Sequence, residues 1–292
     1  MLETIHPNML ALIAAFLVAI SRTLYQKALG RINPNVITAL VNGVSVLFAV
    51  VFYQMGPGVE QWPIQGILWF VANGLVGSLF GRYMSFVSQR IVGVTRTSIV
   101  MQSILVWSTG LSVIFLGEHL TTGIIAGSLL IMVGGALLVW EGEKLQKKIP
   151  LTYYIVPLLT ALTFALAFIV RRYGLAWIPS SPLGMGISTG TATFLMTGIL
   201  CFTTEETGKR WNGGGISIAV VGGVFNAAAA LCFWGAVQMG EIVQVVPINR
   251  LSVLFVIIFS WFFFRKEEAI TWRVVTGGVL SVVGAYLIVI GK

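Results

Sequence analysis

The chain of 292 residues is 57% hydrophobic and only 10% charged, and its mean hydropathy is +0.93. Soluble domains carry about 25% charged residues, so this composition excludes a soluble protein and predicts an integral membrane protein. The net charge of +8 does not indicate a nucleic-acid partner, because membrane proteins collect basic residues in their cytoplasmic loops. The two cysteines lie within apolar runs, so no disulfide framework is expected.

Continuous apolar runs of about 20 residues follow one another along the chain and do not alternate with polar residues, which predicts helices rather than strands. The expected fold is an all-α integral membrane protein with ten transmembrane helices. The first run lacks a basic leader and a cleavage site, so we expect a retained helix rather than a signal peptide. The ten predicted spans are residues 7–27, 34–54, 65–88, 95–116, 121–140, 152–173, 182–203, 215–238, 243–264 and 271–290.

The two halves of the chain repeat each other at a shift of 149 residues. This shift carries Glu118 to Glu267, and the same shift carries Arg22 to Arg171 and Gly66 to Gly215. We therefore predict two five-helix repeats, residues 1–146 and 150–292. Because five is odd, the second repeat enters the membrane from the opposite side, which gives the inverted-topology repeat typical of secondary transporters.

Basic residues gather in one of the two sets of connections between the spans. This bias predicts that these connections are cytoplasmic and that both termini face outward, in a multi-pass protein of a bacterial or archaeal-type inner or plasma membrane. The three lysines at the junction of the repeats contribute most. The basic set contains Lys27, Arg31, Arg90, Lys144, Lys147, Lys148, Lys209, Arg210, Arg265 and Lys266.

Each repeat has an apolar helix, a short break with a glutamate, and a glycine-rich helix. This pattern resembles the EamA-type members of the drug/metabolite transporter superfamily. The resemblance implies a transporter of small metabolites in which helices 1–4 and 6–9 surround a central cavity and helices 5 and 10 are peripheral. The residues that carry it are Leu116, Gly117, Glu118, Gly127, Gly134 and Gly135, then Pro247, Glu267, Gly277, Gly278 and Gly284.

Two features depart from the pattern of this superfamily. Many relatives place both termini in the cytoplasm, whereas the charges here predict the reverse. Small multidrug transporters carry a glutamate within the first helix for protons and cations, whereas Arg22 is the ionised residue within this first span.

No motif in the chain indicates an enzyme. The sequence lacks an HExxH motif, paired carboxylates within a span and a nucleophile elbow. Gly213–Gly215 is not followed by the lysine and hydroxyl residue of a phosphate loop. The sequence therefore predicts no catalytic residue, no metal site and no bound cofactor.

The third span carries a polar stripe at helical spacing, formed by Ser78, Arg82, Ser85 and Gln89. Arg82 lies about 12 Å from the nearest connection at 1.5 Å per residue, which is far for a side chain to reach water. Such residues usually face a bundle interior or a water-filled cavity. Arg82 therefore either contacts substrate or pairs with a carbonyl or a neighbouring polar group.

The ninth span offers Asn249 and Arg250 beside Pro247, approached from the other membrane face. A proline removes a backbone donor and can expose a carbonyl to a cavity, although an ordinary kink is the alternative. Arg22 and Arg171 lie close to span ends, so they can reach water instead of substrate.

Three further residues are candidates with structural alternatives. Gln102 belongs to a polar stripe of the fourth span, Asn226 is a single amide that can join helices, and Trp234 lies deep enough to line a cavity or to fill the core. Glu118 and Glu267 are expected to be structural, because they can accept from N–H groups at the start of helices 5 and 10.

The sequence thus predicts a secondary transporter for a small anionic or zwitterionic metabolite that works by alternating access. A flippase for a lipid or a lipid-linked phosphate or sugar is one alternative, and a non-transporting scaffold or sensor is another. Expected partners are membrane lipids and the small substrate, without nucleic acid, in a monomer or homodimer. The predicted substrate-binding residues are Arg82, Arg250, Asn249, Gln102, Ser78, Ser85, Arg22, Asn226 and Trp234.

Overall fold

The computed structural model is helical throughout the part that it describes, which is residues 5–56, 58–92, 97, 100–140, 150–202, 212–263 and 272–291. Glu267 and the junction lysines Lys144, Lys147 and Lys148 lie outside these residues. The helices are α1 (Pro7–Leu29), α2 (Pro34–Gln54), α3 (Ile64–Asn73), η2 (Gly74–Gly81), α4 (Arg82–Ile91), η3 (Met101–Ser103), α6 (Ile104–Leu116), α7 (Thr122–Trp140), η5 (Leu151–Tyr154), α8 (Ile155–Trp177), α9 (Ser181–Phe202), α10 (Gly213–Met239), α11 (Ile242–Arg250), α12 (Ser252–Phe263) and α13 (Trp272–Ile290).

Local sequence sets the ends of several helices. The first two begin at prolines, Pro7 and Pro34, whose missing N–H is not needed in a first turn. Asn212 caps α10, since its Oδ1 accepts from the Gly215 amide at 3.1 Å. Gly117 ends α6 with φ of 66°, a left-handed conformation that glycine adopts at little cost.

The helices occupy the positions of the predicted spans. Six of them are long and apolar enough to cross a membrane, and four further segments are apolar but shorter. That all ten segments span the membrane stays a prediction. The six long helices are Pro7–Leu29, Pro34–Gln54, Ile64–Ile91, Leu151–Trp177, Ser181–Phe202 and Gly213–Met239.

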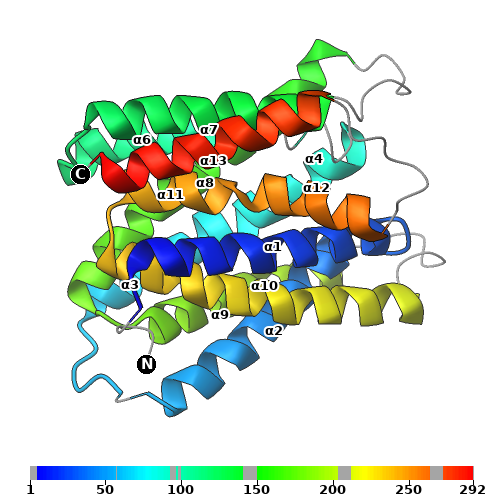
Figure 1. Ribbon diagram of the computed structural model, residues 1–292. Helices are drawn as coiled ribbons and strands as arrows, with labels where there is room; N and C mark the ends of the chain where they lie inside the picture. The colour runs from blue at the N-terminus through cyan, green and yellow to red at the C-terminus, as the bar shows by residue number, and fades with distance from the viewer. Residues whose placement is uncertain are drawn as a thin grey trace.

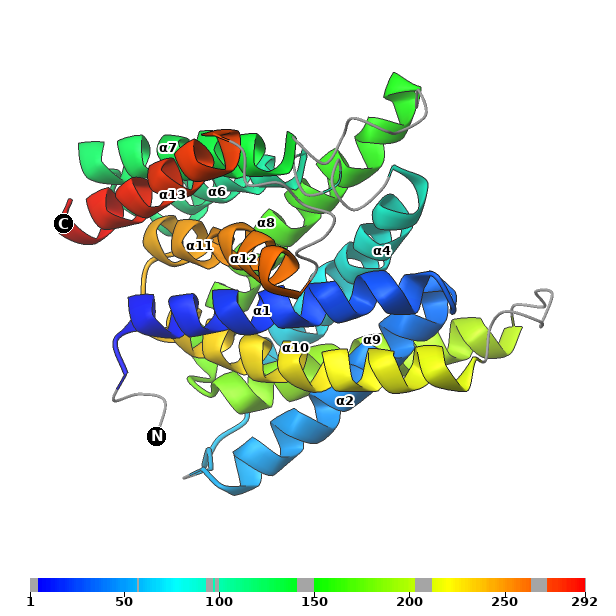
Figure 2. The same ribbon diagram turned by 45° about the vertical axis from the view of Figure 1, so that its right-hand side comes forward.

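Corresponding helices of the two repeats make corresponding contacts. Helix α1 packs along α10, and its counterpart α8 packs along α3, η2 and α4. Likewise α1 contacts α11 and α12 whereas α8 contacts η3 and α6. The helices α2 and α9, and again α7 and α13, pair with their own counterparts. Figures 1 and 2 show α7 and α13 side by side at one edge and α1 beside α10. This pattern is that of a two-fold repeat.

Glycine contacts show that the counterpart helices run antiparallel. In α7, Gly123 approaches Gly291, whereas Gly127, one turn later, approaches Gly284, which comes earlier in the chain. The space at these glycines is filled by the backbone of α13, so the small-residue pattern of the fifth span serves contact within the chain. Antiparallel counterparts are what an inverted repeat requires.

Both chain ends lie at the same end of the bundle (Figure 1). Pro7 packs beside Gly240, and the Thr121 hydroxyl donates to the carbonyl of Gly291. We refer to this as the terminal end, and to the opposite one, where the basic connections leave the helices, as the basic end.

Candidate functional site

Four of the arginines within the helices define the centre of the candidate site: Arg22 of α1, Arg82 of α4, Arg171 of α8 and Arg250 of α11. We name them the arginine column. Arg22 and Arg82 belong to the first repeat, and Arg171 and Arg250 belong to the second. The column therefore joins helices from both repeats.

The two arginines nearer the basic end flank one aromatic contact. The rings of Tyr25 and Phe86 meet edge to face at 5.5 Å, which places α1 against α4. Arg22 lies three residues before Tyr25, and Arg82 lies four residues before Phe86. Each arginine is therefore about one helical turn farther from the basic end than this contact.

Asn226 of α10 lies at the level of Arg22. The Tyr25 hydroxyl donates to the Gly222 carbonyl at 3.1 Å, and α1 and α10 run antiparallel, with Gly240 beside Pro7. Asn226 lies four residues after Gly222, and Arg22 lies three residues before Tyr25. Because the two helices run in opposite directions, both residues lie about one turn from the Tyr25–Gly222 contact on the same side. The Nδ2 of Asn226 is buried and has no hydrogen-bond partner among the described residues.

Aromatic rings hold Arg171 on the terminal side of the bundle. Its guanidinium carbon lies 4.2 Å from the centre of the Trp234 ring, 5.5 Å from that of Phe233 and 5.7 Å from that of Phe168. Trp234 in turn meets Phe70 edge to face at 5.7 Å. The expectation that Arg171 reaches water is therefore wrong, because cation–π contacts hold it inside. Its Nε is buried without a partner.

Arg250 occupies the same terminal-side level. Its neighbour Asn249 donates from Nδ2 to the Ala11 carbonyl at 3.3 Å, which sets the height of α11 beside α1. Arg22 lies about ten residues farther along α1, or roughly 15 Å at 1.5 Å per residue. Arg250 is 8% exposed, and its Nε has no partner in the described part of the chain.

The fourth helix of each repeat changes its helical geometry part-way along, and in the second repeat this happens directly after Arg250. Between α11 and α12 the chain turns at Leu251, four residues after Pro247. The shift of 149 residues relates Leu251 to Gln102, which lies in the tight turn η3 before α6. Gln102 is 2% exposed, and both polar atoms of its side chain lack partners. Paired interruptions at corresponding positions are typical of substrate sites in transporters.

The other residues of the polar stripe in the third span, Ser78, Ser85 and Gln89, bond mainly within their own helix or to α2. The Ser78 side chain is buried, and its carbonyl accepts from Asn42 Nδ2 at 3.0 Å. Ser85 Oγ accepts from Gln89 Nε2 at 3.3 Å, one turn toward the basic end. Residues Gly74–Gly81, just before Arg82, form a π-helix, a geometry often found at functional sites.

Hydrogen bonds tie the helices together at the terminal end. The carboxylate of Glu118 accepts from the amides of Ile242 and Val243, at 2.9 Å each. As predicted, this glutamate accepts hydrogen bonds from the first amides of a helix. The helix is α11 of the other repeat, however, whereas the sequence predicted the helix that follows Glu118 in the chain, which is α7. Arg172 donates to the carbonyls of Val237 and Gln238 at the same end.

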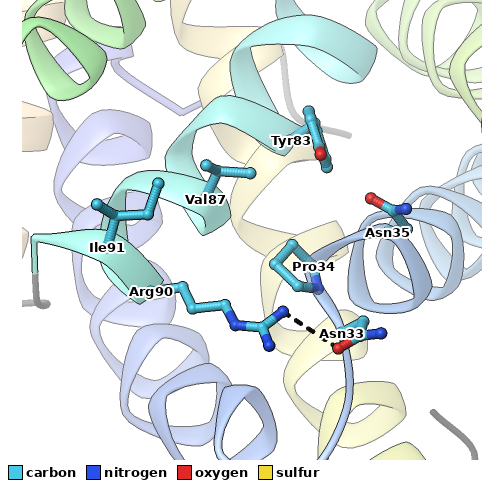
Figure 3. Close-up of a pocket in the computed structure, with 7 residues that line it drawn as sticks. All are labelled: Asn33, Pro34, Asn35, Tyr83, Val87, Arg90 and Ile91. Carbon is cyan, nitrogen blue, oxygen red and sulfur yellow. Dashed lines mark hydrogen bonds between the residues drawn. The ribbon is translucent and has the colours of Figure 1, made fainter. Parts of the chain in front are cut away.

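A pocket of about 230 Å³ opens at the basic end between α2 and α4. Figure 3 shows Arg90 reaching across it toward Asn33, whose Oδ1 accepts from Arg90 Nη1 at 3.1 Å. Tyr83 and Val87 lie on the same face of α4 as Arg90. Tyr83 follows Arg82 directly, so the pocket approaches the basic side of the column without containing it.

The family model described as the EamA-like transporter family matches residues 7–140 and, a second time, residues 151–290. The chain belongs to the EamA-like transporter family. As an EamA-like protein of the drug/metabolite transporter superfamily it is a multi-pass integral membrane protein, and members of this family are transporters. The resemblance inferred from the sequence is confirmed, and the two matched segments correspond to the two repeats.

Other comparisons add the fold alone. A solved structure titled only as a crystal structure of a protein superimposes on this EamA-like chain with a TM-score of 0.77. The match covers 97% of this chain and 98% of the other at 16% identity. No curated protein matches the chain.

The structure thus brings most of the predicted residues of this EamA-like protein to one region. Arg22, Arg82, Arg250 and Asn226 lie along the middle of the bundle, and Trp234 lies under Arg171 rather than open to a cavity. Gln102 lies elsewhere, because its side chain packs against Gly135 of α7. Sequence reasoning did not propose Tyr25 for the site. Its spacing of one turn from Arg22 on α1 was the signal that could have found it.

Proposed function

We propose that this chain is a secondary transporter that moves a small anionic or zwitterionic metabolite by alternating access. One observation carries the proposal: the four arginines of the column lie along the middle of the bundle, and no described helix contributes a carboxylate to them. The chain contains no aspartate, and none of its ten acidic residues falls within the bounds of a described helix. A buried charge without a counter-charge is costly, so a site for an anion accounts for it.

The hydrogen-bond donors of these arginines support a binding role over a purely structural one. Arg82 Nη1, Arg171 Nε and Arg250 Nε are buried and lack partners among the described residues. A protein with a purely structural role would gain stability if each buried arginine had a partner or were an apolar residue, because an unpaired buried charge destabilises the fold. The donors are therefore available to a ligand.

The arrangement of the repeats supports alternating access. The column joins both repeats, and Glu118 links the connection after α6 to the start of α11 at the terminal end only. Rocking of one repeat against the other about a central site would break this link and expose the column from that end.

The test is uptake of radiolabelled probes from the outside medium into proteoliposomes that contain the protein. The probes are malate, glutamate and glycerol 3-phosphate as anions and putrescine as a cation. We expect uptake of at least one anion and none of putrescine. Replacing Arg250 by Lys keeps the charge but loses the planar fork, so flux should fall, and Arg250→Gln should lower it further. The exposed Arg31, changed to Gln, is the matched control and should transport normally.

Melting curves of each variant separate binding from folding. Flux that falls in proportion to the folded fraction would make Arg250 structural. Folded protein that carries putrescine, or that carries no anion while its variants behave alike, would overturn the proposal. Uptake that requires a lipid-linked anion in place of the soluble probes would favour the flippase.

A further inference from the structure

The arginine column has more positive charge than one monovalent anion can balance. Arginine stays protonated at every physiological pH, so four charges persist inside the bundle. No carboxylate lies within the bounds of the described helices to balance any of them. A bound monoanion would still leave three charges uncompensated.

The two levels of the column face each other across the middle of the bundle. Arg22 and Arg82 lie about one turn inside the Tyr25–Phe86 contact, at the basic-side level. Arg171 packs on Trp234, and Arg250 follows Asn249, which bonds to the Ala11 carbonyl, at the terminal-side level. An anionic group between the levels would be attracted by all four. Its position would also lie near the change of helical geometry directly after Arg250.

The unpartnered groups around the column are mainly donors. Arg82 Nη1, Arg171 Nε, Arg250 Nε and Asn226 Nδ2 are buried without a hydrogen-bond acceptor among the described residues. A carboxylate has two oxygens, whereas a phosphate monoester has three terminal oxygens and close to two negative charges at neutral pH. Arginine forks match that geometry with paired hydrogen bonds.

We infer that the substrate carries a divalent head group of the phosphate-monoester type, which binds between the basic-side level of Arg22 and Arg82 and the terminal-side level of Arg171 and Arg250. This inference rests on the proposed function and narrows its substrate class. The head group can belong to a soluble phosphorylated metabolite or to a lipid with a terminal phosphate, since the column recognises the shared dianion.

The experiment is a thermal-shift titration of the purified protein in detergent with three probes. Glycerol 3-phosphate is the dianion, glycerate is the monoanion of similar size, and phosphatidic acid in mixed micelles is the lipid source. Ligands that bind the folded state raise the melting temperature by mass action. We expect glycerol 3-phosphate or phosphatidic acid to bind at least tenfold more tightly than glycerate, and the better of the two identifies the source.

The pH dependence gives an independent readout. A phosphate monoester gains its second charge near pH 6, so the dianion fraction falls about tenfold between pH 7.5 and pH 5. Affinity for the phosphate probe should fall about tenfold with it. Affinity for glycerate should not change, because glycerate stays ionised over this pH range and the arginines stay protonated. Arg171→Gln should reduce the preference for the dianion, while Arg31→Gln should leave it intact.

The outcomes separate this inference from the proposed function. Equal affinity for glycerate and glycerol 3-phosphate, or affinity for phosphate that does not change with pH, would overturn the divalent head group and leave an anion transporter standing. Protein that melts cooperatively but binds and transports no anion would overturn both. If Arg171→Gln fails to fold, Arg82→Gln removes a charge from the same column and should likewise reduce the preference for the dianion.

Discussion

Glu118 links the two repeats at the terminal end, and its replacement by alanine should release that end. Both carboxylate oxygens accept a backbone amide of α11, from Ile242 and Val243, at 2.9 Å each. A hydrogen bond to a charged group contributes about 1.5–3 kcal/mol. Because Glu118 is half-buried, we take the low end and assign about 2 kcal/mol to both bonds together, including the favourable helix N-terminus.

A loss of about 2 kcal/mol changes the ratio of closed to open states roughly 30-fold, since 1.4 kcal/mol is a factor of ten. The assay is the labelling rate of a cysteine at Val245, which is fully buried near the start of α11. Cys201 and Cys232 are first replaced. In detergent, Glu118→Ala should raise the labelling rate at Val245→Cys by up to this factor.

Two comparisons give this prediction its controls. Glu60 is exposed in the connection before α3, so Glu60→Ala should leave the labelling of Val245→Cys unchanged. Ile37 is fully buried at the basic end of α2, and Ile37→Cys should not label faster in the Glu118→Ala protein. Equal acceleration at both cysteines would mean general loosening, and no acceleration at Val245 would refute the link altogether.

Three further predictions follow from packing and charge. Gly127→Ala should lower the free energy of unfolding by about 1–3 kcal/mol, because the new Cβ would meet the carbonyl of Gly284; Gly110→Ala, with nothing nearby, should be neutral or slightly stabilising in the same melting experiment. Asn42→Leu should cost about 1 kcal/mol in that assay, since it removes the buried hydrogen bond to the Ser78 carbonyl, and an unchanged melting temperature would count against it. Reporters active only in the cytoplasm should be silent at both chain ends, and activity at either would reverse the predicted orientation.

The fold could be inferred from sequence because membrane helices are long, apolar and nearly unbroken. The shift of 149 residues also located real counterparts: Gly66 packs against Ile178 at the end of α8, and Gly215 packs against Ile32 after α1. What the pattern did not reveal was which helices pair across the repeats, because both faces of an apolar helix look alike in sequence.

The candidate site was predictable residue by residue but not in its grouping. Arg82 and Arg250 were conspicuous because a charge deep in an apolar span is rare. Arg171 was not, because distance from a helix end says nothing of the rings of Phe233 and Trp234 that hold it. The partner of Glu118 was likewise hidden, since α11 lies more than 120 residues further along the chain.

The absence of carboxylates from the helices bears on the energy source for transport. Moving one charge across a membrane potential is worth about 2.3 kcal/mol per 100 mV, so a dianion gains or loses about 4.6 kcal/mol, or roughly three orders of magnitude in concentration ratio. A cell interior that is electrically negative therefore drives such a substrate outward unaided. Inward movement would need accompanying cations or exchange for another anion, and the described helices contain no acidic side chain to carry a proton or sodium ion. For the dianion inferred above, we therefore expect export or anion exchange.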